Sequence, residues 1–289
     1  GPNGPSVASS HLDAKAVLND KTLFKSIKVF NNAMRQNWIT QWMIKQAKSF
    51  DTENSYLTGK LGFISENAGK TRIFAISDYW SQLSLKPIQI SLYRTLQSIS
   101  TDATKNQEQG FQSLVKESLG HPTYCFDLSS ASDRIPAIMQ KHRLRLMTNQ
   151  TVAESWLSIM TDRHFNIKST GENVRWKVGQ PLGLLSSFPS FALWHHDIIQ
   201  LSYNWENFHK GRPLRFFKQY RILGDDVVIF NKKVADEYQF LIQDVFAISI
   251  NMSKSVIGDS RNSQIEFTKR LALRGKEMSS IKRNILTKS

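Results

Sequence analysis

Apolar side chains recur at three- and four-residue steps between His11 and about Phe50. This spacing predicts helical structure with one apolar stripe. The stripe is formed by Leu23, Ile27, Phe30, Met34 and Trp38. Residues 1–10 are rich in Gly, Pro and Ser and predict coil, and residues 51–70 are polar with turn signals.

Further along, short β-branched and aromatic runs alternate with helical spacing. Strands are predicted at 72–76, 124–127, 165–168, 174–178, 221–223 and 227–230, with shorter ones near 249–251 and 265–268. Helices are predicted at 84–100, 135–148, 152–161, 187–203 and 233–247. The segment Ser169–Asn173 predicts a hairpin turn between two of the strands. The fold class is therefore α+β with a modest antiparallel sheet.

The composition adds a strong positive charge to this picture. The chain has 289 residues, of which 40% are hydrophobic, so it can form a sizeable core. Lys and Arg number 38 against 24 Asp and Glu, a formal charge of +14. This excess favours a polyanionic partner, either nucleic acid or an anionic membrane surface, although an ordinary basic soluble protein fits the charge equally well.

Several protein classes are disfavoured by what the sequence lacks. The single cysteine, Cys125, excludes an internal disulfide and a cysteine-rich zinc site, and it favours a reducing compartment. No apolar run approaches the roughly 20 residues of a membrane span. The opening Gly-Pro-Asn-Gly-Pro has neither an initiating Met nor a targeting pattern, so a fragment or processed product is expected.

Two adjacent carboxylates lie between the runs 221–223 and 227–230. Gly224 precedes Asp225 and Asp226, and its tolerance of positive φ suits a tight hairpin that presents both carboxylates at one sheet edge. Taken alone, this three-residue pattern fits an acidic surface turn equally well. Asp127 also ends an apolar strand, and if the two strands are neighbours it meets Asp225 at the same edge.

Carboxylates gathered in this way repel one another unless cations lie between them. Mg²⁺ takes a few carboxylates together with substrate phosphates, and Mn²⁺ is a possible substitute. Two such ions about 4 Å apart can activate a 3′-hydroxyl and stabilise a pyrophosphate leaving group. The pattern therefore favours in-line phosphoryl transfer with Asp127, Asp225 and Asp226 as metal ligands.

Asp133 has two interpretations that can coexist. Because Pro136 suits the first turn of a helix, Asp133 is a good N-cap. It could also contact the ribose 2′-hydroxyl of an incoming nucleotide, directly or through a relay.

The segment Gly179–Ser187 is a shaped loop before a long helix. Ser186 and Ser187 with Pro189 fit a simple helix start, whereas Gly183 and the serines also fit a mobile loop that touches template and ribose.

Basic residues supply the remaining candidates. Lys70 and Arg72 occupy alternate positions at the start of a predicted strand, so their side chains would point to the same side. Two cations there would suit a triphosphate, and a solvated strand face is the alternative. Lys254 could protonate leaving pyrophosphate, or be a surface lysine. From Arg261 onward there are eight Lys or Arg against two Glu, which suits product-strand phosphates or a solvated tail. His195 and His196 point apart on a helix and are assigned to packing or hydrogen bonding.

The order of these elements resembles the motif series of viral RNA-dependent RNA polymerases. The basic fingers motif is similar to Gly69–Arg72, motif A to the segment around Asp127, and motif B to Gly179–Ser187. Motif C is similar to Gly224–Asp226, motif D includes Lys254, and motif E lies near Glu266–Arg270.

The sequence most closely resembles the polymerases of mitoviruses. Similar stretches are Asp78-Tyr-Trp-Ser-Gln82, Leu85-Lys-Pro87, Asp127-Leu-Ser-Ser-Ala-Ser-Asp133, Gly179-Gln-Pro-Leu-Gly183 and Ile222-Leu-Gly-Asp-Asp226. The opening Gly-Pro-Asn-Gly-Pro also looks like family sequence. The resemblance covers nearly the whole chain.

This resemblance implies a right-hand polymerase with an antiparallel palm sheet flanked by helices. It implies Mg²⁺-dependent RNA synthesis from NTPs on an RNA template, contacts of Lys269 and Arg270 with RNA, and residence in host mitochondria. The expected division is a helical fingers region (1–121), a palm with motifs A to E (122–270) and a basic start of the thumb (271–289). Family polymerases are longer, so most of the thumb and part of the fingers are expected to be missing.

Three functions remain to be compared. The carboxylates and cations favour an active polymerase domain, whereas the length favours a non-catalytic RNA-binding remnant. A reverse transcriptase shares the palm, but Gly before the Asp pair and the spacing of Asp127 and Asp133 favour RNA synthesis on RNA.

Overall fold

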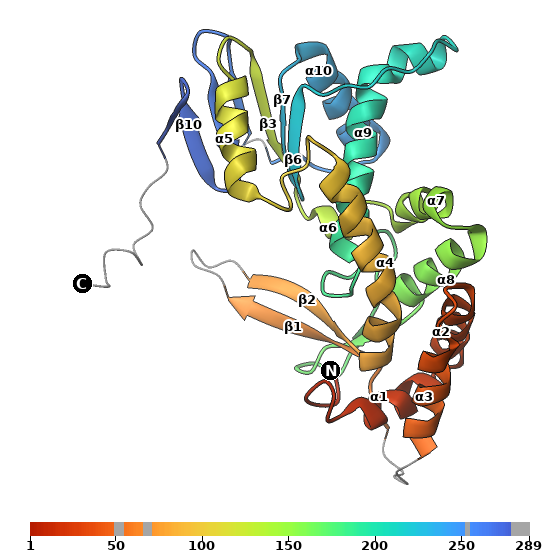
Figure 1. Cartoon of the computed structure of the whole chain (residues 1–289). Helices are drawn as coiled ribbons and strands as arrows, with labels where there is room; N and C mark the ends of the chain where they lie inside the picture. Colours follow the sequence, from red (N-terminus) through yellow and green to blue (C-terminus); the bar gives the residue numbers. More distant parts are fainter. Residues whose placement is uncertain (49–54, 66–70, 252–254, 279–289) are drawn as a thin grey trace. The chain divides into compact units, whose positions relative to one another are not determined.

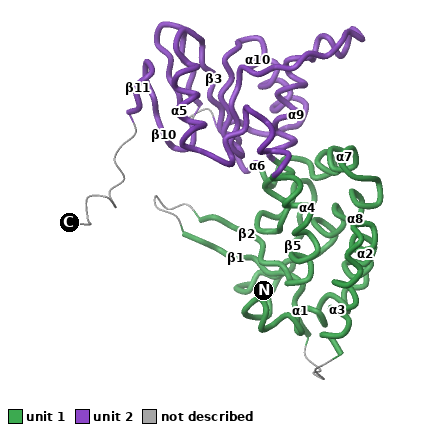
Figure 2. Tube along the Cα trace, in the orientation of Figure 1, with its two compact units in different colours: residues 1–93, 132–191 green, residues 94–131, 192–289 purple. Residues whose placement is uncertain are grey.

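The computed structural model describes residues 1–48, 55–65, 71–251 and 255–278, which form two compact units (Figures 1 and 2). Unit 1 contains residues 1–93 and 132–191, and unit 2 contains residues 94–131 and 192–289. Three helices continue through the points where the chain passes from one unit to the other: α4 (Tyr79–Ser98), α6 (Ala131–Arg134) and α9 (Ser187–His209). The expected boundaries between fingers, palm and thumb, at 121/122 and 270/271, are based on the order of the motifs and not on compactness. They stay a prediction.

The N-terminal part of unit 1 forms three helices: α1 (Ser10–Asn19), α2 (Lys21–Ala33) and α3 (Asn37–Lys48). The predicted continuous stripe is wrong beyond Phe30. Asp20 separates the first two helices and caps α2 by accepting the Leu23 N–H, and Arg35 takes a left-handed φ of 57° after α2. Because the turn at Arg35 changes the direction of the chain, Trp38 falls off the stripe and is 56% exposed.

Unit 1 also has a four-stranded sheet in the order β2-β1-β4-β5. Its strands are β1 (Gly59–Ser65), β2 (Thr71–Ser77), β4 (Phe165–Asn166) and β5 (Asn173–Val174). The predicted hairpin between β4 and β5 is confirmed, and β2 lies where a strand was expected. β1 was missed, because glycines weaken its strand pattern. A Cβ at Gly62 would lie 2.5 Å from the Phe74 ring, so a larger residue there would require that ring to move.

The predicted helices of unit 1 are confirmed in α4, α7 (Ala137–Met147) and α8 (Gln150–Thr161). α7 and α8 pack against each other, and α8 packs against α2. Trp156 and Phe30 are fully buried in this helical part of the unit.

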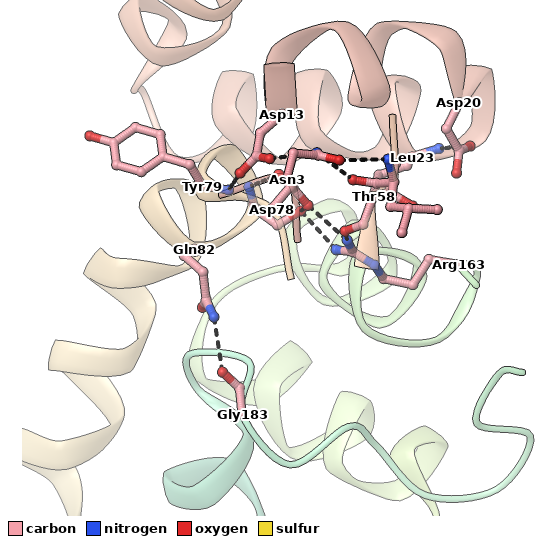
Figure 3. Close-up of polar contacts among 12 residues, drawn as sticks. Asn3, Asp13, Asp20, Leu23, Thr58, Asp78, Tyr79, Gln82, Arg163 and Gly183 are labelled. Carbon is pink, nitrogen blue, oxygen red and sulfur yellow. Dashed lines mark hydrogen bonds and ion pairs between the residues drawn. The ribbon is translucent and has the colours of Figure 1, made fainter. Parts of the chain in front are cut away.

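A buried polar network connects the parts of unit 1 (Figure 3). Arg163 and Asp78 form an ion pair of 2.7 Å whose side chains have no exposed surface. Asp78 also accepts the Ser81 N–H at 2.7 Å, while Arg163 donates to the Thr58 carbonyl. Asp13 accepts the Tyr79 N–H at 2.8 Å; burial is the main cause that raises its pKa, with the Asp78 charge adding to it. The Asp78–Gln82 stretch is therefore a structural hub of unit 1.

Unit 2 is built on an antiparallel sheet in the order β6-β7-β3-β8. Its strands are β3 (Thr123–Asp127), β6 (Tyr220–Leu223), β7 (Asp226–Ile229) and β8 (Val256–Gly258). Side chains alternate between the two faces of the sheet. Cys125 and Val228 join a core with Phe111 on one face, and Phe126 on the other face stacks on Tyr238 at 5.6 Å.

Helices and a second small sheet pack around this sheet. They are α5 (Gln107–Glu117), α10 (Lys232–Phe240), the π-helical turn η1 (Leu241–Val245), β9 (Gln264–Phe267), β10 (Arg270–Leu273) and β11 (Lys276–Glu277). The predicted helix 233–247 is thus divided, and the strand predicted near 249–251 is only a bridge between Ile250 and Leu128. α5, β8, β10 and β11 were not predicted, because their apolar patterns are short. The α+β class with antiparallel sheets is confirmed.

Candidate active site

The register between β3 and β7 brings two predicted carboxylates face to face. Asp127 pairs with Asp226, one step beyond the pairing of Phe126 with Val227. Directly opposed residues in an antiparallel pair lie close enough for their side chains to interact. The register is strongly specified, since a slip of one residue would move Cys125 and its neighbours to the opposite face of the sheet.

Asp225 lies in the adjoining turn. Leu223 pairs with Asp226, which leaves Gly224 and Asp225 as a two-residue hairpin turn between β6 and β7. Gly224 has a φ of 62°, as predicted. The prediction that the turn presents both carboxylates is wrong in one respect, because Asp226 is the half-buried first residue of β7 and Asp225 alone is exposed in the turn.

His195 supports this turn from α9. Its Nδ1 lies 2.8 Å from the Gly224 carbonyl oxygen, and its Nε2 lies 2.7 Å from the Tyr238 hydroxyl. His196 contacts the Tyr220 hydroxyl at 2.9 Å and Asp102 at 3.1 Å. The assignment of both histidines to packing and hydrogen bonding is confirmed. Sequence reasoning did not connect His195 with the carboxylate turn, since no local pattern links positions 195 and 224.

The three carboxylates interact electrostatically. Burial is the main cause that raises the pKa of Asp226 to about 7; the charges of Asp225 and Asp127 contribute to this shift, and a 3.2 Å bond from the Thr268 N–H opposes it. A cation placed among these groups would offset that repulsion. Asn251, which was not singled out from sequence, donates its backbone N–H to the Asp127 carbonyl at 2.8 Å.

The carboxylate oxygens of this site can be compared with the ligands that a divalent cation requires. Over the described ranges 1–48, 55–65, 71–251 and 255–278, no group of three or more His, Cys, Asp or Glu side chains is arranged to hold a metal ion by itself. Mg²⁺ usually keeps waters and takes one or two carboxylates plus substrate phosphates. The facing pair Asp127 and Asp226, with Asp225 beside it, fits such a partial, oxygen-only site.

Asp133 occupies a different environment in unit 1. The N-cap prediction is wrong, because Asp133 lies within α6 and Pro136 precedes the first residue of α7 without a side-chain cap. The carboxylate instead accepts the Trp176 indole N–H at its Oδ1, over 2.7 Å. Trp176 was not predicted as a site residue, since it lies in an unremarkable segment after the hairpin.

The loop Gly179–Ser187 is held tightly within unit 1. Gly183 has a φ of 116°, and a Cβ there would lie 2.2 Å from the Ala75 carbonyl oxygen. Ser186 is buried, and its hydroxyl accepts the Trp156 indole N–H at 2.8 Å. Ser187 begins α9 and its carbonyl accepts a bond from Gln180 at 2.7 Å, while Pro189 lies in the first turn, as predicted. The Trp156 bond gives the Ser186 side chain a structural role, whereas the Gln180 bond to Ser187 uses its main-chain carbonyl.

The basic candidates have different surroundings. Lys70 and Lys254 lie outside the described residues. Arg72 is an exposed residue of β2. Lys269 has a φ of 61° in the turn between β9 and β10. Arg270 pairs with Glu108 and Glu277 at 2.7 Å each and lies 4.0 Å from the centre of the Phe111 ring, so its guanidinium is engaged within unit 2.

The buried histidine gives this site a testable pH dependence. Burial lowers the pKa of His195 from 6.5 to about 4. Because the unfolded chain binds a proton between these values and the folded chain does not, His195 costs stability as the pH falls from 6.5 to 4, by at most about 3 kcal/mol. Chemical denaturation of His195→Gln is expected to show a shallower loss of unfolding free energy over this range than the unsubstituted chain. Equal slopes would contradict this expectation.

Comparison with known proteins decides the family. The model of the mitovirus RNA-dependent RNA polymerase family matches residues 1–288. The chain belongs to this family. Among its relatives, the RNA-directed RNA polymerase of Cryphonectria parasitica mitovirus 1 is 36% identical over 218 residues, which cover 74% of this chain and 25% of that polymerase. The chain thus spans about a quarter of the viral polymerase.

This member of the mitovirus polymerase family is also similar to proteins of a plant. An uncharacterized mitochondrial protein of Arabidopsis thaliana is 35% identical over 181 residues, covering 61% of this chain and 68% of that protein.

Solved polymerase structures share the fold of this family member. A human picobirnavirus RNA-dependent RNA polymerase superposes with a TM-score of 0.54 at 14% identity, covering 78% of this chain and 46% of that one. Truncated apo telomerase from Candida tropicalis superposes with a TM-score of 0.53 at 15% identity, covering 83% and 59%. These similarities establish the polymerase fold alone. No described helix of the chain is long and apolar enough to cross a bilayer.

Proposed function

We propose that this chain is the catalytic region of an RNA-dependent RNA polymerase that adds nucleotides from NTPs to a growing RNA strand for viral RNA replication. The observation that carries the proposal is the facing of Asp127 and Asp226 across β3 and β7, with Asp225 in the adjoining turn. Family membership supports the reaction, and the sheet register supports the assignment of these residues.

Asp127, Asp225 and Asp226 would hold Mg²⁺, for which Mn²⁺ could substitute. When bound, divalent cations lower the pKa of the attacking 3′-hydroxyl and neutralise the leaving pyrophosphate. The protein contributes position: the β3–β7 register and the His195 bond to the Gly224 carbonyl hold the carboxylates in place. Lys254 would donate a proton to pyrophosphate.

The remaining candidates would bind substrate and RNA. Lys70 and Arg72 would contact the triphosphate, and Asp133 would contact the ribose 2′-hydroxyl. Gly183, Ser186 and Ser187 would shape the loop that faces template and ribose, with Ser186 acting through the loop framework because its hydroxyl is bonded to Trp156. Lys269 is the stronger candidate for product-strand phosphates, since Arg270 is engaged by two carboxylates.

Primer extension tests the proposed reaction. The chain, alone and within a longer polymerase, is given an RNA primer and template with NTPs and Mg²⁺, and extension should disappear when EDTA removes the metal. Matched reactions with dNTPs or a DNA template distinguish a reverse transcriptase. RNA binding without extension in either context would contradict the proposal and support a non-catalytic RNA-binding protein.

RNA binding is expected to depend steeply on salt. Phosphate contacts release counterions, so affinity should fall roughly tenfold or more between about 50 and 200 mM salt. Lys269→Met should reduce the slope of log affinity against log salt by about 0.7 to 0.9. Lys232→Met is a matched control, because that lysine pairs with Asp236 on the surface. An RNA affinity that does not change with salt, measured by fluorescence anisotropy, would contradict the expectation that cationic side chains bind the RNA phosphates.

Residence in host mitochondria is also part of the proposal. It is supported by family membership and by the similarity to mitochondrial proteins of Arabidopsis thaliana.

A further inference from the structure

A direct hydrogen bond holds the side chain of Asp133. The indole Nε1 of Trp176 donates to Oδ1 over 2.7 Å, although 43 residues separate the two positions. Asp133 is exposed and Trp176 is half-buried. An ionised carboxylate is an acceptor-only group with two oxygens. A donor on Oδ1 therefore restricts rotation of the carboxylate and directs Oδ2 toward other donors.

The backbone of Asp133 is held by the same segment. The Gly179 N–H donates to the Asp133 carbonyl at 3.1 Å, and the Gln180 N–H donates to the Ser132 carbonyl at 2.9 Å. A Cβ at position 179 would lie 2.2 Å from the Ser132 carbonyl oxygen and 2.5 Å from that of Asp133. Only glycine permits this approach. Residues 176–180 thus hold both the side chain and the main chain at position 133.

The indole ring is itself well anchored. Its edge-to-face contact with Phe165 has ring centres 5.1 Å apart, and Phe165 is fully buried in β4. The guanidinium of Arg163 lies over the Phe165 ring, 5.3 Å from the centre of that ring. Arg163 belongs to the buried ion pair with Asp78. The position of the indole N–H is therefore set by the core of unit 1, since each group in this series packs on the next.

The same indole borders an open space in unit 1. A cavity of about 520 Å³ is lined by Trp176 with Arg175, Lys177, Pro136, Leu157 and Asp162, among others. A volume of this size lies within the range typical of small-molecule sites. Arg175 and Lys177 bring positive charge to this lining, which suits an anionic ligand.

We propose that Trp176 is a positioning residue for sugar selection: its N–H fixes Asp133 so that Oδ2 accepts a hydrogen bond from the 2′-hydroxyl of the incoming ribonucleotide. This inference rests on the proposed polymerase function. A deoxyribonucleotide lacks that donor and gains nothing from the positioned oxygen. The preference for ribose then depends on the Trp176 bond as well as on the carboxylate.

Trp176→Phe tests this role, because phenylalanine keeps an aromatic ring against Phe165 and removes only the N–H donor. The measured quantity is the ratio of kcat/KM for ATP to that for 2′-dATP in primer extension within the longer polymerase. The ratio is expected to fall about tenfold, through slower use of ATP with 2′-dATP unchanged. Trp38→Phe, an exposed tryptophan of α3, is the matched control and should leave the ratio unaltered.

A second variant separates positioning from folding. Asp133→Ala should lower the ratio by at least as much, and the double variant should lose no more than Asp133→Ala alone, since Trp176 acts through that carboxylate. An unchanged ratio in Trp176→Phe, or an equal loss with both nucleotides, would overturn the inference and leave Trp176 a structural residue. If the unsubstituted polymerase extends no primer, the proposed function itself fails and this inference fails with it.

Discussion

Asp225→Asn is expected to abolish nucleotide incorporation, with a loss of about three orders of magnitude or more in a longer polymerase supplied with Mg²⁺. Asparagine keeps the size of the side chain and one acceptor oxygen but removes the negative charge. Asp225 is the exposed carboxylate of the turn, beside the facing pair Asp127 and Asp226. Removing its charge should weaken the cation site without disturbing β6 or β7.

RNA binding by the same variant should stay within a few-fold, because phosphate contacts come from cationic side chains and not from this turn. Primer extension and fluorescence anisotropy measure the two properties separately. Asp236→Asn is a suitable control, since this surface carboxylate on α10 lies in the same unit and pairs only with exposed Lys232 among the described contacts. Unchanged incorporation by Asp225→Asn would overturn the metal assignment.

The second large effect concerns folding. Arg163→Met is expected to lower the free energy of unfolding by about 3 to 5 kcal/mol, because it leaves the Asp78 carboxylate buried without its cation. Neither side chain of this pair has exposed surface, and Asp13 adds a second acidic group nearby (Figure 3). Loss of the bond from Arg163 to the Thr58 carbonyl adds to the cost.

Urea denaturation of the chain measures this loss. The control is Lys210→Met, which breaks the exposed pair with Glu206 on α9 and should cost at most about 1 kcal/mol. The double variant Arg163→Met/Asp78→Asn should be less destabilised than the sum of its single changes, since each removes the same ion pair. A cost for Arg163→Met no larger than that of the control would show that the buried pair contributes little.

Asp78 illustrates how family resemblance and physical explanation differ. From the sequence alone, the stretch Asp78–Gln82 is informative only as a resemblance to mitovirus polymerases. The structure gives it a reason: Asp78 pairs with Arg163, the Trp80 indole donates to the Ser10 carbonyl at 2.8 Å, and Gln82 donates to the Gly183 carbonyl at 2.9 Å. This stretch therefore connects α1, the segment before β4 and the loop before α9.

Errors in the sequence-based predictions have identifiable causes. The stripe from Leu23 to Trp38 follows helical spacing, but a left-handed residue at Arg35 interrupts it. Asp133 and Pro136 have the spacing of a helix start, yet a tryptophan 43 residues away takes the carboxylate. In each case, a conformation or contact outside the reach of local spacing overrode a reasonable local preference.

The sequence by itself determined the features that depend on neighbours along the chain: the alternating strands, the glycine turn before Asp225, the helices of unit 1 and the order of the polymerase motifs. Only the tertiary structure decided which carboxylate faces which, that Ser186 and Arg270 are internally bonded, and that Trp176 holds Asp133. The physical reason is that periodicity shows which side of an element is buried, whereas a strand register or a buried polar partner depends on residues tens of positions away.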